Sequence, residues 1–363
     1  MDKNKSLTIN KIFSLAVKSH QEGKTDIAQK FYNQVISIDP NYSQAHNNLG
    51  VIFKTLGENQ KAIDYLKKAI KINPNYADAH NNLGLIFKKL GEYQKAKECY
   101  DKTIVINPNH INVHYNLGVI FKELGENQKA KECYDKAIEI NPNHASAHNN
   151  LGILFKELGE NQKAKECYDK AIVINPNYEN AHNNLGVIFK ELGENQKAKK
   201  CYDKAIVINP NYAHAHYNLG NIFKELGENE KAKIYFEKTI KIDPNNIPAY
   251  NNLGNIFKEL GENEKAKNCY EKAIEIDPSF ADAVNNLGVI YTVLGENEKA
   301  LGCYKKAFEI NPNFYEALSN IANHYIVQLT DFDIAISKSN EVLKIQQKNY
   351  KFINQSVSLF KLK

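Results

Sequence analysis

The chain has 363 residues and a formal net charge of +5, from 47 lysines and arginines against 42 acidic residues. Most lysines alternate with glutamates, as in KELGENQKAKECYDK, which is typical of a solvated helix surface and argues against a nucleic-acid-binding face. No segment approaches the roughly 18 apolar residues of a membrane span, and the N-terminus lacks the features of a secretory signal, so we expect a cytoplasmic protein without membrane contact.

Internal repetition sets the organisation of the chain. Nine of the ten prolines recur every 34 residues from Pro40 to Pro312, and sixteen of the eighteen glycines follow the same period in series that begin at Gly50 and Gly57. Because proline and glycine fix backbone geometry, their period is the period of the fold. The sequence therefore predicts about ten copies of one unit.

In chain order, residues 1–8 are expected to form an N-terminal extension and residues 9–42 a weaker first unit. Full-pattern units follow over residues 43–314, and residues 315–349 form a weaker last unit with one inserted residue and no proline. Atypical end units are usual in repeat arrays. Residues 350–363 are expected either to form a capping helix or to begin a further domain.

The unit at 43–76 supplies the frame, with Ser43 as position 1 and Tyr76 as position 34. Positions 3, 7, 10, 11 and 14 are apolar at helical spacing, which predicts a first helix with one buried face (Ala45, Leu49, Ile52, Phe53 and Leu56). The sequence GEN at 57–59 should end that helix. A second helix should follow with its own apolar stripe (Ala62, Leu66, Ala69 and Ile72), and the sequence NPN at 73–75 should end it.

Leu-Gly at positions 7 and 8, an aromatic residue at 11, alanines at 20 and 27, and proline at 32 resemble the tetratricopeptide repeat. The resemblance covers eight full units, and position 4 departs from it, since that position is mostly histidine here. It implies an all-α fold, namely an α-solenoid that winds as a right-handed superhelix of about ten 34-residue helix–turn–helix units.

Asparagine occupies position 6 in nine successive units, and we call these residues the amide row: Asn48, Asn82, Asn116, Asn150, Asn184, Asn218, Asn252, Asn286 and Asn320. Position 6 lies on one flank of the first helix together with positions 2, 9 and 13. In tetratricopeptide arrays that flank lines the concave surface, so the resemblance implies a peptide-binding groove. An amide both donates and accepts hydrogen bonds, which suits contact with the main chain of an extended peptide.

The uninterrupted amide row resembles the superhelix that precedes the catalytic region of O-linked N-acetylglucosamine transferases, where such a row would hold substrate main chain. The glycosyltransferase domain itself is absent from this sequence. Two alternatives to peptide contact stay open at this point. The asparagines could hydrogen-bond the neighbouring repeat, or they could be inherited through duplication of one unit.

Residues that suggest chemistry also repeat once per unit. Six cysteines occupy position 23 without a C-x-x-C pair, so we expect reduced thiols rather than zinc ligands or disulfides (Cys99, Cys133, Cys167, Cys201, Cys269 and Cys303). The histidines at position 4 are expected at the interface between repeats. Since an enzyme needs one unique site, we expect no catalytic residues, no metal and no cofactor.

The leading hypothesis is a scaffold for protein–protein interactions that binds an extended protein or peptide segment in the concave groove. The alternative is the substrate-recruiting arm of a glycosyl- or other group-transferase whose catalytic domain lies outside this chain. An array without an evolved ligand is a third hypothesis.

Overall fold

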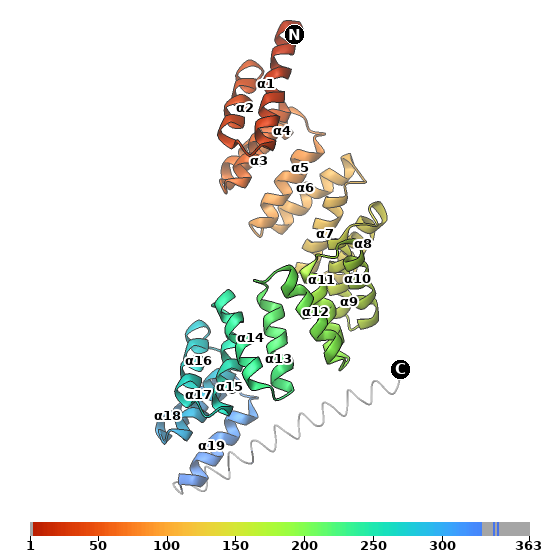
Figure 1. The fold of residues 1–363 in the computed structure, drawn as a ribbon. Coiled ribbons are helices and arrows are strands. Elements are labelled where there is room, and N and C mark those ends of the chain that lie inside the picture. Colours follow the sequence, from red (N-terminus) through yellow and green to blue (C-terminus); the bar gives the residue numbers. More distant parts are fainter. Residues whose placement is uncertain (1–2, 329–336, 338–339, 341–363) are drawn as a thin grey trace. The chain divides into compact units, whose positions relative to one another are not determined.

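The computed structural model describes residues 3–328, together with residues 337 and 340, and these residues contain nineteen α-helices and no strand (Figure 1). The helices are α1 (Lys3–Gln21), α2 (Thr25–Ile38), α3 (Ser43–Thr55), α4 (Asn59–Ile72), α5 (Ala77–Lys89), α6 (Tyr93–Ile106), α7 (Ile111–Glu123), α8 (Asn127–Ile140), α9 (Ala145–Glu157), α10 (Asn161–Ile174), α11 (Glu179–Glu191), α12 (Asn195–Ile208), α13 (Ala213–Glu225), α14 (Asn229–Ile242), α15 (Ile247–Glu259), α16 (Asn263–Ile276), α17 (Ala281–Val293), α18 (Asn297–Ile310) and α19 (Tyr315–Gln328).

The chain divides into two units, Met1–Pro176 with α1–α10 and Asn177–Lys363 with α11–α19. In each unit the two helices of a repeat pack against each other, and the second helix packs on the first helix of the next repeat. First helices of neighbouring repeats also contact each other directly: α3 contacts α5, and α15 contacts α17. This stacking confirms the predicted all-α solenoid. The expected second helix of the last unit and the segment 350–363 lie outside the described residues.

The turn between the helices of a repeat is set by one glycine. In the unit at 43–76, Gly57 has a φ of 78°, which places it in the left-handed region where glycine meets no steric penalty. The amide of Glu58 donates to the carbonyl of Phe53 at 2.9 Å, and the amide of Gly57 donates to the carbonyl of Lys54 at 3.2 Å. This Schellman pairing satisfies the last carbonyls of the first helix and ends it where the sequence predicts.

A second glycine lets the two helices approach each other. A Cβ atom on Gly118 in α7 would lie 2.5 Å from the Tyr134 ring of α8, well inside van der Waals contact. The same overlap recurs at Gly84 with Tyr100 in the preceding repeat. The ring at position 24 therefore lies directly on the backbone of the first helix, and Tyr134 is completely buried.

The core follows the predicted stripes most closely at their centres. Ala45, Leu49 and Ile52 are buried, Phe53 and Ile72 are half-buried, and Leu56 is 51% exposed. The difference arises because Leu56 is the C-cap residue of α3, where the chain already turns away from the neighbouring helix. The predicted buried face of the first helix thus ends one turn early.

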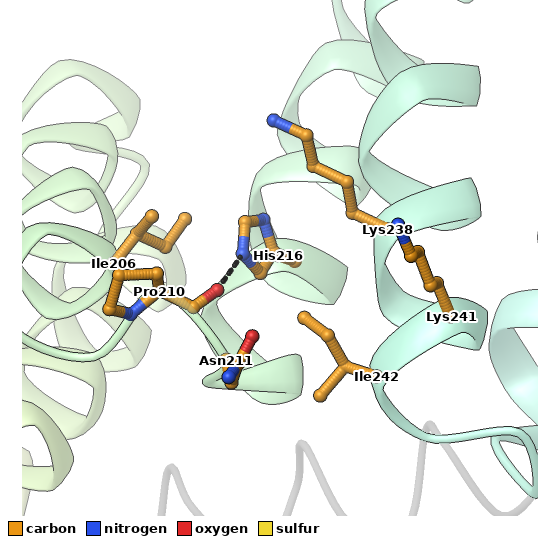
Figure 2. A pocket seen from close by; sticks show the side chains of 7 residues that line it. All are labelled: Ile206, Pro210, Asn211, His216, Lys238, Lys241 and Ile242. Carbon is orange, nitrogen blue, oxygen red and sulfur yellow. Dashed lines mark hydrogen bonds between the residues drawn. The ribbon is translucent and has the colours of Figure 1, made fainter.

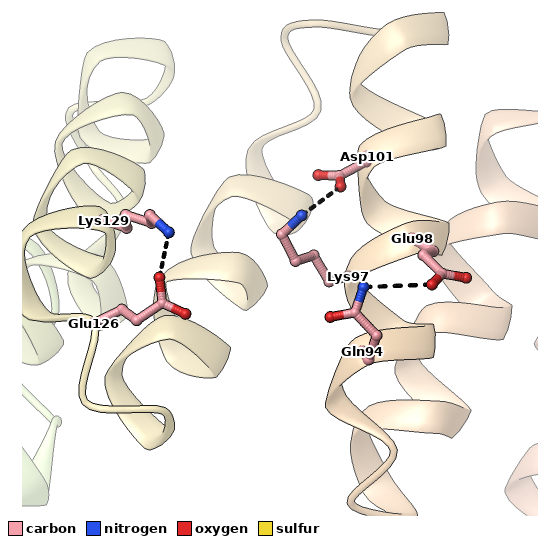
Figure 3. A network of polar contacts seen from close by, with 6 residues as sticks. All are labelled: Gln94, Lys97, Glu98, Asp101, Glu126 and Lys129. Atoms are coloured by element: carbon pink, nitrogen blue, oxygen red, sulfur yellow. Dashed lines mark hydrogen bonds and ion pairs between the residues drawn. The ribbon is translucent and has the colours of Figure 1, made fainter.

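Charges on the second helices are paired locally (Figure 3). Lys97 contacts Asp101 at 2.9 Å one turn further along α6, and Lys129 pairs with Glu126 at the start of α8. The Lys129 ammonium also lies 5.5 Å from the centre of the Phe121 ring, and equivalent lysines repeat this contact in other units. Such exposed pairs contribute at most about 1 kcal/mol each. Their balance agrees with the solvated surface that the sequence predicts.

We expect Gly118→Ala to lower the free energy of unfolding by about 1–3 kcal/mol, because the new methyl group has no room beside Tyr134. Gly302→Ala is the matched control, since Gly302 lies within α18 and has nothing within 4 Å of its Cβ direction. That variant should gain about 0.5–1 kcal/mol from the better helix propensity of alanine. Urea unfolding followed by circular dichroism measures both, and equal effects of the two substitutions would contradict the close contact as the cause.

Candidate functional site

Histidines at position 4 hold the loop that enters each repeat. The Nε2 atom of His114 lies 2.8 Å from the Pro108 carbonyl oxygen, and His148 contacts the Pro142 carbonyl in the same way at 3.0 Å. Since a carbonyl only accepts, Nε2 carries the proton and donates. His114 is buried. These histidines therefore tie the proline turn to the next first helix, which accounts for position 4 without metal or acid–base chemistry.

The amide row contacts the preceding repeat. The Nδ2 atom of Asn82 donates to Oδ1 of Asn47 at 3.1 Å, across 35 residues of sequence. The same bond joins further pairs one repeat apart: Asn218 to Asn183 at 2.9 Å, Asn286 to Asn251 at 3.0 Å and Asn320 to Asn285 at 2.9 Å. Where position 5 is tyrosine, its hydroxyl accepts instead, as Tyr115 does from Asn150 at 3.2 Å.

The structure thus gives the amide row the structural role that the sequence left open as one alternative. The acceptors at position 5 were not singled out from the sequence, although the recurring Asn-Asn doublet was visible there. Asn47, Asn183 and Asn285 are 4–5% exposed, so their carbonyls lie where an unpaired polar group would be costly.

Members of the amide row differ in what they leave available. Among the described residues, Asn82 and Asn286 make only this one bond, so each keeps an N–H and a carbonyl oxygen for another partner. In contrast, the Nδ2 atom of Asn252 donates to both Tyr217 and Asn221, and its Oδ1 accepts from Lys224 at 3.1 Å. Asn252 is therefore committed within the protein, whereas Asn82 and Asn286 are half-exposed.

Lysines at position 12 connect neighbouring first helices. Lys122 pairs with Glu157 at 2.8 Å, and Lys190 pairs with Glu225 at the same distance. In another repeat Lys88 donates instead to Oδ1 of Asn116 at 2.8 Å, and burial lowers the pKa of the Lys88 ammonium. The lysines along this flank therefore either pair with glutamates or donate hydrogen bonds to amide oxygens.

One cavity opens beside the amide row, between α17, α18 and α19. Its volume is about 270 Å³, and its lining includes Asn320 of the amide row with Val289 and Val293 at positions 9 and 13. Val293 is 60% exposed. Glutamate occupies position 13 in the five preceding repeats (Glu123, Glu157, Glu191, Glu225 and Glu259), so the valine at this position is particular to the repeat at 281–314.

The six cysteines lie on second helices, and the structure places no disulfide between them. Burial raises the pKa of Cys99, Cys133 and Cys167 to about 11 and that of Cys269 to about 12. Cys167 is buried and the other three are half-buried, and a thiol with so high a pKa is a poor nucleophile at neutral pH. No group of three His, Cys, Asp or Glu side chains in the described part of the chain is placed to hold a metal ion.

Comparison with protein families identifies the repeats. Family models described as "Tetratricopeptide repeat" match residues 77–110, 111–144, 213–246 and 281–314, and also 31–64, 133–166, 235–268 and 15–42. A further model, "TPR repeat", matches residues 52–91, 154–193, 186–227 and 254–293. A search of curated proteins finds no match.

Solved structures share this architecture. PilF of Pseudomonas aeruginosa is 22% identical, with a TM-score of 0.51 over 56% of this chain and 92% of its own. YrrB, described as a TPR protein with an unusual peptide-binding site, is 28% identical, with a TM-score of 0.44 over 52% of this chain and 97% of its own. MamA is 26% identical, with a TM-score of 0.42 over 46% of this chain and 97% of its own. The likeness to PilF shows the fold alone.

Family and architecture together support a scaffold for protein–protein interactions. Across residues 3–328, no helix is both long and apolar enough to cross a membrane.

The thiols yield a direct test. At pH 7, Cys99, Cys133, Cys167 and Cys269 should react with iodoacetamide on the order of ten to a hundred times more slowly in the folded protein than in urea, because burial suppresses their thiolate form. Alkylation followed by peptide mass spectrometry measures each site separately. Equal rates in the folded and unfolded protein would contradict the burial, and near-stoichiometric zinc in protein purified without chelator would overturn the assignment as reduced thiols.

Proposed function

The chain belongs to the tetratricopeptide repeat family, and on that basis we propose that it binds an extended peptide segment of a partner protein along the flank that carries the amide row. The supporting observation is that amides such as Asn82 and Asn286 are fixed by one hydrogen bond and keep a second N–H and the carbonyl uncommitted. A side chain whose orientation is already fixed loses little further entropy when a ligand binds.

The spacing of the repeats suits a main-chain ligand. Packed neighbouring helices lie about 8–10 Å apart, and an extended peptide advances about 3.3 Å per residue. About every third peptide residue would therefore meet a new amide. Because an amide reads the peptide bond rather than a side chain, the amide row supplies affinity that tolerates many sequences.

The cavity at Val289, Val293 and Asn320 supplies selectivity in this proposal. Two valines and one member of the amide row lie together, so a peptide held by its main chain would place an apolar side chain in the cavity. A substrate-recruiting arm of a transferase would use the same surface, and both versions predict the same binding behaviour for this chain.

The amide row is tested with a peptide selected from a twelve-residue random display library. Asn286→Ala should weaken binding of that peptide about threefold to tenfold, as expected for one hydrogen bond. Asn251→Ala is the matched control, because it removes the same inter-repeat bond from the other side and keeps the Asn286 side chain, which can still contact the peptide. Calorimetry and thermal melts on both variants separate affinity from stability.

If both variants lose stability alike and bind the selected peptide as well as the original protein does, the amide row has only a structural role. The proposal would also be contradicted if no two peptides selected from the library competed with each other for binding to this flank.

The cavity is tested by Val293→Glu, which installs the glutamate that five other repeats carry at position 13 and should therefore leave the fold intact. A charge in the cavity should reduce affinity at least about tenfold for a peptide with a leucine anchor, because burying such a side chain contributes about 1.5–3 kcal/mol. Replacing the leucine by serine in the peptide should have a similar effect, and should add nothing further in the Val293→Glu variant. Independent, additive losses would show that the leucine binds elsewhere.

A further inference from the structure

Two repeats share a set of side chains on their second helices that the other full-pattern repeats lack. Tyrosine replaces cysteine at position 23, and lysine occupies position 29 in addition to position 26, where every full-pattern repeat carries lysine. The sets are Tyr65, Lys68 and Lys71 in one repeat and Tyr235, Lys238 and Lys241 in the other. Elsewhere position 29 is valine or glutamate: Val105, Glu139, Val173, Val207, Glu275 and Glu309.

In the second of these repeats the lysines border a cavity of about 620 Å³. It lies between the end of α12, the loop into α13, and the last turns of α14, away from the amide row on the first helices. Figure 2 shows Pro210 and His216 on one side and Lys238 and Lys241 on α14 across from them. Its lining is Ile206, Pro210, Asn211, His216, Lys238, Lys241 and Ile242.

All seven lining residue types recur at the equivalent positions of the other repeat: Ile36, Pro40, Asn41, His46, Lys68, Lys71 and Ile72. Six of these seven residue types belong to the repeat pattern, and most of them also line the cavity around His148, as Ile138, Pro142, Lys170 and Ile174 show. Among the lining residues, only the lysine at position 29 sets these two repeats apart.

The wall of the cavity is built alike in both repeats. His216 lies 3.0 Å from the Pro210 carbonyl and 6.0 Å, centre to centre, from the Tyr235 ring, which in turn stacks on Phe223 at 5.4 Å. The corresponding distances at the repeat 43–76 are 2.9 Å for His46 with Pro40, 6.0 Å for His46 with Tyr65 and 5.3 Å for Tyr65 with Phe53. Burial lowers the pKa of His216, so the imidazole in this wall is uncharged at neutral pH.

The charge at the cavity comes from the two lysines. Lys238 lies over the Tyr235 ring at 5.5 Å, and among the described residues neither Lys238 nor Lys241 has an acidic partner within ion-pairing distance. Elsewhere on these second helices lysines are commonly paired, as Lys233 is with Glu230. Two exposed lysines without an ion-pair partner in the described part of the chain thus stand beside the apolar side chains of Ile206 and Ile242 (the isoleucine floor), although Glu237 on the same helix lies outside the lining.

A third cavity, of about 450 Å³, lies among α8, α9 and α10 and provides a contrast to the cavity at Lys238 and Lys241. It is lined by equivalent residues around His148 and Pro142, but Val173 replaces the second lysine and Asp169 joins the lining. Asp169 also pairs with Lys165 at 3.0 Å. One cation and one carboxylate leave this cavity without an excess of positive charge.

We propose that the cavity between α12, α13 and α14 binds an acidic segment of a partner protein, with an aliphatic side chain on the isoleucine floor and flanking carboxylates on Lys238 and Lys241. The equivalent residues of α2, α3 and α4 form a second copy of the site. Charge complementarity selects the carboxylates, and the apolar floor distinguishes this ligand from a simple anion. The site is on the second helices, so it stands independently of binding at the amide row.

The test uses the full chain with ¹³C-labelled isoleucine methyl groups and the capped peptide acetyl-Glu-Leu-Glu-amide as the probe. Titration should shift the Ile206 and Ile242 signals and leave Ile138 and Ile174 of the Val173 cavity unchanged. Higher ionic strength should weaken the effect, since exposed charges are screened. The neutral peptide acetyl-Gln-Leu-Gln-amide and inorganic phosphate are the two comparison ligands.

A graded series at one position measures the contribution of charge. Lys241→Val and Lys241→Glu introduce residues that this chain already carries at position 29, so both should keep the melting temperature. Lys241→Val should weaken the peptide about twofold to fivefold and Lys241→Glu more strongly, as expected for loss and reversal of a solvent-exposed ion pair. Val173→Lys should strengthen binding at the contrasting cavity.

Three results would overturn the proposal: no shift of Ile206 and Ile242 with the acidic peptide, equal binding of the glutamine peptide, or dissociation constants unchanged along the Lys241 series. Phosphate shifting the same methyl signals as strongly as the peptide, with no loss when the peptide leucine becomes serine, would show a simple anion site and would likewise overturn it.

Discussion

The contact between the backbone of the first helix and the side chain at position 24 of the second helix is the constraint on which the full repeats depend. This side chain is Leu66 in the repeat at 43–76 and an aromatic ring in the others. Gly118 has no room for a methyl group beside Tyr134, so the distance between α7 and α8 is set by one ring thickness. Because the same pair of positions recurs along the chain, as at Gly254 with Tyr270, every repeat has nearly the same geometry. A regular repeat is what allows equivalent side chains to form rows, so the possible binding surfaces follow from this contact.

Polar bonds then connect one repeat to the next, and they do so on two different faces. On the first helices, Asn286 reaches Asn251 and so joins amides of neighbouring repeats. At the loops, His216 holds the Pro210 carbonyl and fixes how the chain enters α13. Neither bond is worth more than about 1.5 kcal/mol by itself. Buried and repeated, they specify the register of stacking that apolar packing alone would leave loose.

Periodicity was sufficient to predict the helices, the solenoid and the small residues at close contacts, because these depend on local spacing. It failed at Leu56, where membership of the apolar stripe suggested burial but the helix had already ended. The partner of Asn286 lies 35 residues away, and the stacking distance that brings Asn251 to it is not encoded in any short pattern. The peptide contact assigned to the amide row stays a prediction, since the bonds that the structure shows there lie within the protein.

The cavity at Lys241 escaped prediction for a different reason: periodicity reveals what recurs, and this feature is a departure from recurrence. In an array of equivalent units, a repeated side chain can bind only what is itself repetitive, such as the main chain of an extended peptide. Recognition of a particular sequence requires positions that break the period, because only these distinguish one place along the array from another. Val293 and Lys241 are both of this kind, and each replaces a residue that the chain uses elsewhere at the same position. Selectivity in this protein is therefore to be sought where its repeats differ, and affinity where they agree.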